Sequence, residues 1–239
     1  MRKNYEDKMA LYAMGDFHLS SQNPAKQMNQ FGSLWENHPQ KIKENIERIV
    51  KPDDTIVITG DHSWAIKYEN AKPDLQFIAN LPGRKILIRG NHDFFWAKGM
   101  TKRLNNDFDG RLHFLQNNYF TYEDYALVGT KGLSYDEEIE NYEKLYMREL
   151  GRLRISFEGA KTDGYDKFIM FLHYPPTSVN EEESEFTRIA EEYCACQVVY
   201  SHCHGEKHFG DSIIGERNGI RYSLVSADFL KFIPKKILG

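Results

Sequence analysis

The sequence predicts an α/β fold with two β-sheets in one domain. Strand and helix signals alternate as far as Asp93, which is typical of a parallel sheet covered by helices. From Arg111 to Gly129 apolar segments are separated by a turn at Glu123-Asp124, which indicates antiparallel strands. Because no linker or internal repeat interrupts the 239 residues, we expect residues 1–239 to form a single domain.

The strands are predicted from short apolar runs that end in polar residues. Runs this short and rich in Val, Ile and Leu are typical of strands buried on both faces of a sheet. Five of them are ALYAMGD to Asp16, TIVITGD to Asp61, KILIRGNHD to Asp93, FIMFLHYPP from Phe168, and QVVYSHCH to His204. A further hairpin is expected at Arg217-Asn218-Gly219, because an Asn-Gly pair favours a tight turn.

Three helices are predicted between or after these strands. The first begins near Pro39, a favourable first-turn residue, and three isoleucines then follow on one helix face, Ile42, Ile46 and Ile49. The second covers about residues 74–80 and is closed by Leu81-Pro82-Gly83. A charged third helix is expected over about residues 136–159.

Charge and hydropathy limit the classes of partner. The chain has 31 basic and 35 acidic residues and a formal net charge of -4. It contains no long basic run, so a nucleic-acid partner is possible but not favoured. The N-terminus lacks the apolar core of a signal peptide, and no segment approaches the roughly 20 apolar residues of a membrane span. We therefore expect a cytoplasmic protein with no membrane association, and its three cysteines, an odd number, suit reduced thiols.

Polar residues follow each of the five predicted strands. In open α/β sheets ligands bind beyond the carboxyl ends of the strands, so these residues are expected to converge. They include five of the nine histidines, and the full set is Asp16, His18, Asp61, Asn91, His92, Asp93, His173, His202 and His204. Carboxylate, imidazole and amide groups suit first-row divalent metals, and the absence of cysteine from the set argues against a cysteine-based structural zinc site.

Each motif alone has a simpler interpretation. Asp16 and His18 would fit a turn with a satisfied histidine, and His173 would fit a strand-ending residue. Their joint order along the chain favours a shared site. The histidines at positions 38, 113 and 208 do not belong to this ordered set of motifs, and we expect them on the surface or in packing contacts.

The ordered series of motifs resembles the calcineurin-like metallophosphoesterase superfamily. The matching pieces are Asp16-x-His18, Gly60-Asp61, Gly90-Asn91-His92-Asp93, His173 and His202-x-His204. The segments GDHSWA, LPGRKILIRGNHDFFW and HYPP more narrowly resemble a bacterial subgroup of predicted phosphohydrolases. The resemblance implies a sandwich of two mixed β-sheets flanked by helices, in four αββα layers.

The resemblance also implies a role for each residue. Asp16, His18 and His204 would hold one metal ion, Asn91, His173 and His202 a second, and Asp61 would bridge both. Manganese, iron, zinc and nickel all suit such ligands. A water bridging the two ions would attack phosphorus, His92 would protonate the leaving oxygen, and Asp93 would orient the His92 imidazole.

Two positions depart from the family pattern. Ser201 stands where a glycine usually precedes the His-x-His pair, which raises the question of how the second metal is affected. His62 is unusual after the bridging aspartate, and we favour a side chain that points elsewhere over one that supports a ligand from behind or contacts substrate. For the aromatic residues Trp64, Phe94, Phe95 and Trp96 we favour packing against the sheet over stacking on a substrate ring.

The substrate is predicted from what the motifs lack. Protein phosphatases of the superfamily carry arginines near the bridging aspartate and after the Asn-His pair, whereas His62-Ser63-Trp64 and Phe94-Phe95-Trp96 occupy these places here. A phosphodiester carries less charge and needs less cationic binding. We therefore expect metal-dependent hydrolysis of a small phosphodiester or nucleotide. The alternatives are a phosphomonoesterase or nuclease of the same fold, or a binding protein that retains the fold without the chemistry.

Overall fold

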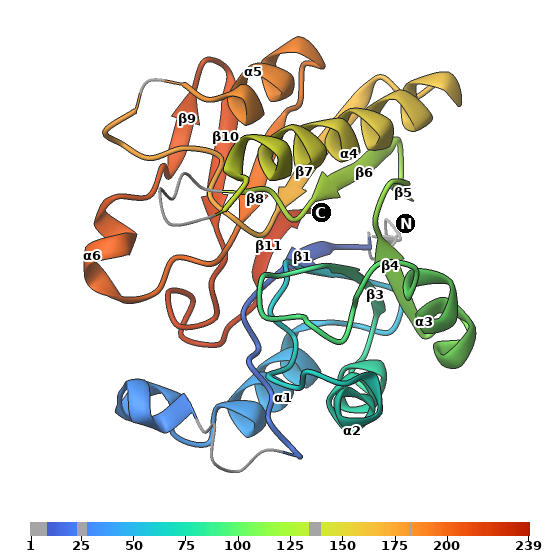
Figure 1. Cartoon of the computed structure of the whole chain (residues 1–239). Helices are drawn as coiled ribbons and strands as arrows, with labels where there is room; N and C mark the ends of the chain where they lie inside the picture. Colours follow the sequence, from blue (N-terminus) through green and yellow to red (C-terminus); the bar gives the residue numbers. More distant parts are fainter. Residues whose placement is uncertain (1–8, 23–27, 134–139, 182) are drawn as a thin grey trace, which may run out of the picture.

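The computed structural model of the protein describes residues 9–22, 28–133, 140–181 and 183–239. Two mixed β-sheets pack face to face, and helices cover both outer faces (Figure 1). The predicted α/β sandwich is confirmed. The assignment of residues 1–239 to one domain stays a prediction.

The first sheet has five strands in the order β11-β1-β2-β3-β4. Strands β1 to β4 are parallel, and β11 is antiparallel to β1. The strands are β1 (Leu11–Ala13), β2 (Thr55–Ile58), β3 (Arg84–Ile88), β4 (Leu112–Leu115) and β11 (Lys235–Leu238). Its outer face is covered by α1 (His38–Ile49), α2 (Tyr68–Ala79) and α3 (Thr101–Phe108), and α1 is preceded by the 3-10 helices η2 (Met28–Phe31) and η3 (Ser33–Trp35).

The second sheet has six strands in the order β5-β6-β7-β8-β10-β9. Its four central strands are parallel, and the edge strands β5 and β9 are antiparallel to their neighbours. The strands are β5 (Phe120–Tyr122), β6 (Tyr125–Thr130), β7 (Lys167–Leu172), β8 (Gln197–Tyr200), β9 (Gly215–Arg217) and β10 (Ile220–Leu224). Helices α4 (Tyr142–Thr162) and α5 (Glu185–Glu192) cover its outer face, and the short α6 (Gly205–Gly210) follows β8 (Figure 1).

Alternation along the strands divides the core between the layers. In β2, Ile56 and Ile58 pack under the helices of the first sheet, whereas Val57 faces the second sheet. From the opposite side, Ile169 and Phe171 of β7 enter the same central layer. Since both faces of these strands are buried, their apolar runs are continuous, as the sequence indicated.

Helix α2 begins at Tyr68, earlier than the residue-74 start predicted from the sequence. The prediction was wrong because proline is disfavoured inside a helix, so no helical residues were expected before Pro73. Here Pro73 lies inside the helix. The residue whose carbonyl loses its helical partner, Glu69, is exposed to solvent, where water can replace the missing donor.

The other local predictions can be compared directly with the structure. Helix α4 begins at Tyr142, and residues 136–139 of the predicted helix lie outside the described residues. The hairpin turn between β9 and β10 is confirmed, with Asn218 at φ 52 and Gly219 at φ 77. All three cysteines are free. Within the described part of the chain, every helix is too short or too polar to cross a bilayer.

Candidate metal centre

The structure brings the predicted ligands together at one edge of the sandwich. They lie in loops that follow β1, β2 and β3 of the first sheet and β7 and β8 of the second. Because these strands are parallel within each sheet, their carboxyl ends share one edge. Strand topology therefore accounts for the convergence of residues that are up to 188 positions apart, from Asp16 to His204.

One group consists of Asp16, His18 and His204, and one possible ligand atom from each lies within 4.8 Å of the others. The Nε2 atoms of His18 and His204 are 3.4 Å apart, and His204 Nε2 is 4.0 Å from Asp16 Oδ1. Two nitrogens bound to one ion at about 2.1 Å are themselves about 3 to 3.4 Å apart. Asp16 Oδ1 is buried and has no hydrogen-bond partner among the described residues, so its lone pairs fit a cation.

A second group consists of Asp61, His173 and His202, again within 4.8 Å. His173 Nε2 lies 3.2 Å from His202 Nδ1 and 2.6 Å from Asn91 Oδ1. The Thr59 carbonyl lies 2.9 Å from His173 Nδ1 and accepts its proton, which leaves Nε2 with a lone pair for a metal. The three residues predicted for the second ion thus lie together.

The Asp61 carboxylate lies between the two groups. Its Oδ2 is 3.7 Å from His18 Nε2 and 3.6 Å from His173 Nε2. The backbone N–H of His92 donates to Oδ1 at 2.8 Å and fixes the orientation of the carboxylate. One oxygen therefore faces a histidine of each group, as expected for a shared ligand.

Burial makes the two aspartates hard to ionise without a cation. Burial raises the pKa of Asp16, and burial with the nearby Asp93 carboxylate raises the pKa of Asp61 to about 7. A divalent ion opposes both effects because it stabilises the carboxylate anion.

The histidines are mostly held neutral. Burial, with neighbouring histidines, lowers the pKa of His18 and lowers that of His202 to about 2. At His204 burial acts in the same direction, but Asp16 and Asp228 outweigh it and raise the pKa to about 9. A neutral imidazole is the form that binds a metal. The donor set therefore fits two divalent cations.

Four predicted ligands have a left-handed backbone conformation. Asp16, His18, Asp61 and His202 have φ values of 59, 45, 52 and 72. This conformation costs roughly 1 to 2 kcal/mol per residue with a β-carbon. Backbone bonds between the loops hold it, including Asp16 N to Gly60 O at 2.9 Å and His18 N to Asp61 O at 2.8 Å. Strain of this kind clusters at functional sites.

Gly90 lets two ligand loops approach each other. A β-carbon at this position would lie 2.1 Å from Asp61 Oδ1 and 2.2 Å from Asp61 N. Any side chain there would displace the Asp61 carboxylate. The glycine of the Gly-Asn-His-Asp motif is therefore explained by contact with Asp61.

The predicted proton donor, His92, lies beside both an aromatic side chain and a predicted ligand. Its ring centroid is 4.4 Å from that of Trp64 and 5.8 Å from that of His18. Trp64 packs against the core, as predicted, and also stacks on His18 with centroids 4.8 Å apart. Phe95 and Trp96 are buried, which confirms their packing prediction, whereas Phe94 is exposed and the packing prediction was wrong for it.

Asp93 bonds to His62 and to the backbone. Its carboxylate accepts hydrogen bonds from Gly90 N at 2.7 Å, Asp61 N at 3.1 Å, and His62 N and Nδ1, both at 2.8 Å. These bonds, above all those with His62, lower the pKa of Asp93 although burial alone would raise it. The predicted orientation of His92 by Asp93 has no counterpart among these four bonds. His62 bonds to Asp93, which also accepts from Asp61 N, so it makes a supporting contact behind a predicted ligand, the alternative that the sequence left open.

Asp228 is a contact of the site that sequence reasoning missed. Its Oδ1 lies 3.0 Å from His204 Nδ1, and its Oδ2 accepts from Gly205 N at 3.3 Å. A carboxylate in this position orients the imidazole and makes the opposite nitrogen more basic. A signal was present, because Asp228 follows the apolar run of β10, a strand parallel to β8.

Ser201 fits its unusual position because of Gly15. The Ser201 hydroxyl donates to Thr59 O at 2.7 Å, and a β-carbon on Gly15 would lie 2.5 Å from the Ser201 oxygen. The same hydroxyl is 3.3 Å from His173 Nδ1. The serine therefore adds a polar contact behind a predicted ligand and occupies none of the ligand positions.

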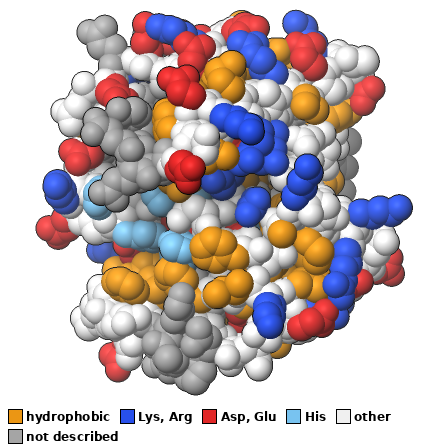
Figure 2. Space-filling model, viewed as in Figure 1, with side chains coloured by type: hydrophobic (Ala, Val, Ile, Leu, Met, Phe, Trp, Pro, Cys, Tyr) orange, Lys and Arg blue, Asp and Glu red, His pale blue; other side chains and the backbone are white. Residues whose placement is uncertain are grey.

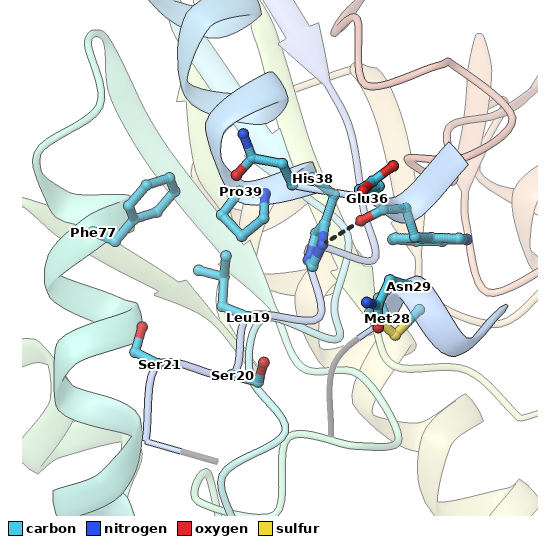
Figure 3. A pocket seen from close by; sticks show the side chains of 11 residues that line it. Leu19, Ser20, Ser21, Met28, Asn29, Glu36, His38, Pro39 and Phe77 are labelled. Atoms are coloured by element: carbon cyan, nitrogen blue, oxygen red, sulfur yellow. Dashed lines mark hydrogen bonds between the residues drawn. The ribbon is translucent and has the colours of Figure 1, made fainter. Parts of the chain in front are cut away.

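A cavity of about 410 Å³ opens over the two groups. Its walls combine predicted ligands with apolar side chains, namely His18, Met28, Phe31, Trp35, Asp61, Trp64, His92, His202, His204, Gly205 and Asp228. A second cavity, of about 490 Å³, shares Met28 and Trp35 with it (Figure 3). There the His38 ring bonds to the carbonyls of Trp35 and Phe17 at 3.1 and 3.0 Å, which confirms His38 as a packing residue.

The family is decided by a match to the model of the calcineurin-like phosphoesterases over residues 9–206. The chain belongs to this family. All of the predicted ligands lie inside the matched region of this phosphoesterase. No curated protein matches the sequence.

Several solved structures share the fold of this phosphoesterase. Phosphopantetheinyl hydrolase of Mycobacterium tuberculosis is similar with a TM-score of 0.58 and 13% identity, over 97% of this chain and 96% of that one. A protein of Thermus thermophilus has a TM-score of 0.54 and 11% identity, over 97% and 99%. A protein of unknown function from Aquifex aeolicus has a TM-score of 0.50 and 15% identity, over 96% of both chains. At these identities the likeness concerns the fold.

Proposed function

We propose that this calcineurin-like phosphoesterase uses two divalent metal ions to hydrolyse a small phosphodiester or nucleotide. The observation that carries the proposal is the position of Asp61 Oδ2, within 3.7 Å of one histidine from each ligand group. Asp16, His18 and His204 would hold one ion, Asn91, His173 and His202 the other, and Asp61 both. When bound, the ions would supply a hydroxide nucleophile at neutral pH and neutralise charge on the phosphoryl group.

The chain itself supplies positioning and a proton. His92 borders the cavity over both ligand groups and would donate a proton to the leaving oxygen. The backbone N–H of His92 donates to the Asp61 carboxylate. The same residue would therefore position a metal ligand through its backbone and donate a proton through its side chain. Asp93 and His62 hold the backbone of both loops, which keeps His92 near the shared carboxylate.

Metal binding gives the direct test of the ligand set. We expect elemental analysis to find two ions per chain after incubation with manganese, iron, zinc or nickel and removal of excess. At a free concentration of 100 Kd an ion adds about 2.7 kcal/mol to the free energy of unfolding. For a chain of this size that corresponds to a Tm increase of roughly 5 to 11 °C. A chain that retains no metal and shows no shift in Tm would refute the proposal.

The ester preference follows from the charge of the cavity. The described residues that line it include no Lys or Arg, so apart from the metals its walls offer imidazole and carboxylate groups and apolar and aromatic contacts. A diester monoanion could be neutralised by the ions alone. We expect a higher kcat/KM for an aryl phosphodiester than for the matching monoester at neutral pH, measured by release of the same phenol.

Three arginines distant in sequence, Arg103, Arg111 and Arg188, could supply the missing positive charge only by folding into the site. Arg103 and Arg188 form surface ion pairs, and Arg111 bonds to Gln76. These contacts support the diester preference. A clear preference for the monoester would contradict it.

A further inference from the structure

Four cationic side chains gather beside the candidate metal centre. Arg89 directly follows β3 of the first sheet, Lys131 directly follows β6 of the second, and Arg148 and Arg152 lie on α4. The ends of β3 and β6 are close, since a β-carbon on Gly129 would lie 3.1 Å from Ile88 Cδ1. We refer to Arg89, Lys131, Arg148 and Arg152 as the cationic cluster.

Within the part of the chain that the structure describes, the cationic cluster has less negative than positive charge around it. The buried Glu149 carboxylate lies 2.7 Å from Arg152 Nη1 and 3.5 Å from Arg148 Nε. Among the described residues, neither Arg89 nor Lys131 has a carboxylate within 4.0 Å, and the buried Arg89 Nε has no hydrogen-bond partner. Among the described residues, the carboxylates of Glu149 and Asp93 thus face four cations, and Asp93 already accepts hydrogen bonds from His62 and the backbone.

The crowding is unfavourable for the free protein. Lys131 is partly buried, and Arg89, Arg148 and Arg152 surround it with charge of the same sign, which Glu149 offsets only in part. Arg89 is also partly buried, and the charges of Asp93 and Glu149 offset its own in part. Partly buried cations that lie close together repel each other and have lost part of their hydration, and both effects cost free energy. A bound anion would compensate both costs.

The cationic cluster is connected to the predicted ligands through Tyr174. Lys131 Nζ lies 5.2 Å from the centroid of the Tyr174 ring, and that ring is 4.3 Å from the ring of His202. The Lys131 carbonyl also accepts from His173 N at 3.1 Å. Figure 2 shows Lys and Arg side chains gathered on the face that carries the exposed histidines. One aromatic ring, that of Tyr174, therefore separates Lys131 of the cluster from a predicted ligand.

We propose that the cationic cluster binds a second phosphate group of the substrate while the reacting phosphoester lies at the metal centre. Arginine side chains match the oxygens of a phosphate bidentately, and Lys131 adds a point charge. The cluster does not line the cavity above the ligands, so it would contact a phosphate that is not hydrolysed. The role in substrate binding rests on the proposed function. The anion site does not.

Binding of inorganic pyrophosphate tests the site without catalysis. Calorimetric titration uses the full chain with divalent metals removed, as wild type and as the double variant Lys131→Gln, Arg148→Gln. Loss of its charge-assisted bonds is expected to raise the Kd of the double variant roughly 10- to 100-fold. The control is Arg103→Gln, whose side chain is 52% exposed against 51% for Arg148 and pairs with Glu69 elsewhere on the surface. The control should keep the wild-type Kd. Equal Kd values for wild type and double variant, or no binding to either, would overturn the anion site.

A kinetic comparison on the metal-loaded enzyme then tests the substrate role. The substrates are p-nitrophenyl propyl phosphate and the same diester with a phosphate on the far carbon of the propyl group. We expect the double variant to raise KM roughly 10- to 100-fold for the phosphorylated diester and to leave the plain diester unchanged. An equal loss for both would place the cluster at the reacting phosphate and overturn the proposal. If neither diester is hydrolysed while pyrophosphate binding still depends on the cluster, the proposed function fails and the anion site stands.

Discussion

Replacing His92 by alanine is expected to lower kcat by roughly 10²- to 10⁴-fold while both metal ions stay bound. The substitution removes the imidazole that borders the cavity and keeps the backbone N–H that donates to Asp61 Oδ1. Ligand geometry should therefore survive the loss of the proton donor. The measurements are kcat and metal content on the same preparation. The loss in kcat should be smaller for esters with good leaving groups, which need less protonation.

The matched control is His208→Ala, which removes an exposed histidine outside the ligand set. It should leave kcat and metal content unchanged. Equal losses for good and poor leaving groups in His92→Ala would assign His92 a positioning role. Loss of an ion in the same variant would make it a ligand.

Asp61→Asn is expected to abolish tight binding of the metal pair and with it the activity. The substitution keeps the size of the side chain and removes the charge that faces His18 and His173. Loss of an orienting group outside the ligand set typically costs roughly 10- to 100-fold in metal affinity, and loss of a shared ligand should exceed this. Metal titration monitored by calorimetry gives the affinity directly.

The stability of the same variant separates folding from function. Burial and Asp93 raise the pKa of Asp61 to about 7, so its ionised form costs free energy in the metal-free fold. Metal-free Asp61→Asn should therefore have a Tm at least equal to that of the metal-free wild type at pH 8. Added manganese should raise the Tm of the wild type and of the exposed-carboxylate control Asp53→Asn, but not that of Asp61→Asn. A metal response equal to that of the wild type would show that Asp61 is not a shared ligand.

The ligand groups were predictable because they follow strand ends. Parallel strands bring their carboxyl ends to one edge, so the order of Asp16, Asp61, His173 and His202 along the chain already implied convergence. The start of α2 was missed because a proline inside a helix is indistinguishable in sequence from one in its first turn.

Contacts that depend on loop geometry or on the meeting of both sheets were not predictable. Asp93 and His92 are adjacent in sequence, yet Asp93 bonds to His62 because that loop turns its carboxylate toward the backbone of the neighbouring loop. The residues of the cationic cluster come from two sheets and a helix, so no short sequence motif predicts the cluster. Arg89 lies one residue before the Gly-Asn-His-Asp motif, but its relation to Lys131 exists only once both sheets have packed.

Because of the left-handed backbone of Asp16, His18, Asp61 and His202, the stability of the fold and the retention of the predicted ligands favour different residues at these positions. Glycine adopts this conformation without the penalty paid by residues with a β-carbon, so glycine at any of the four positions relieves strain and deletes a predicted ligand in one step. Laboratory evolution that rewards heat resistance alone would accumulate such glycines and yield robust, inactive proteins. Selection that also requires metal retention would keep the strained residues. Glycine at these four positions in a related sequence would therefore indicate that metal binding is no longer under selection there.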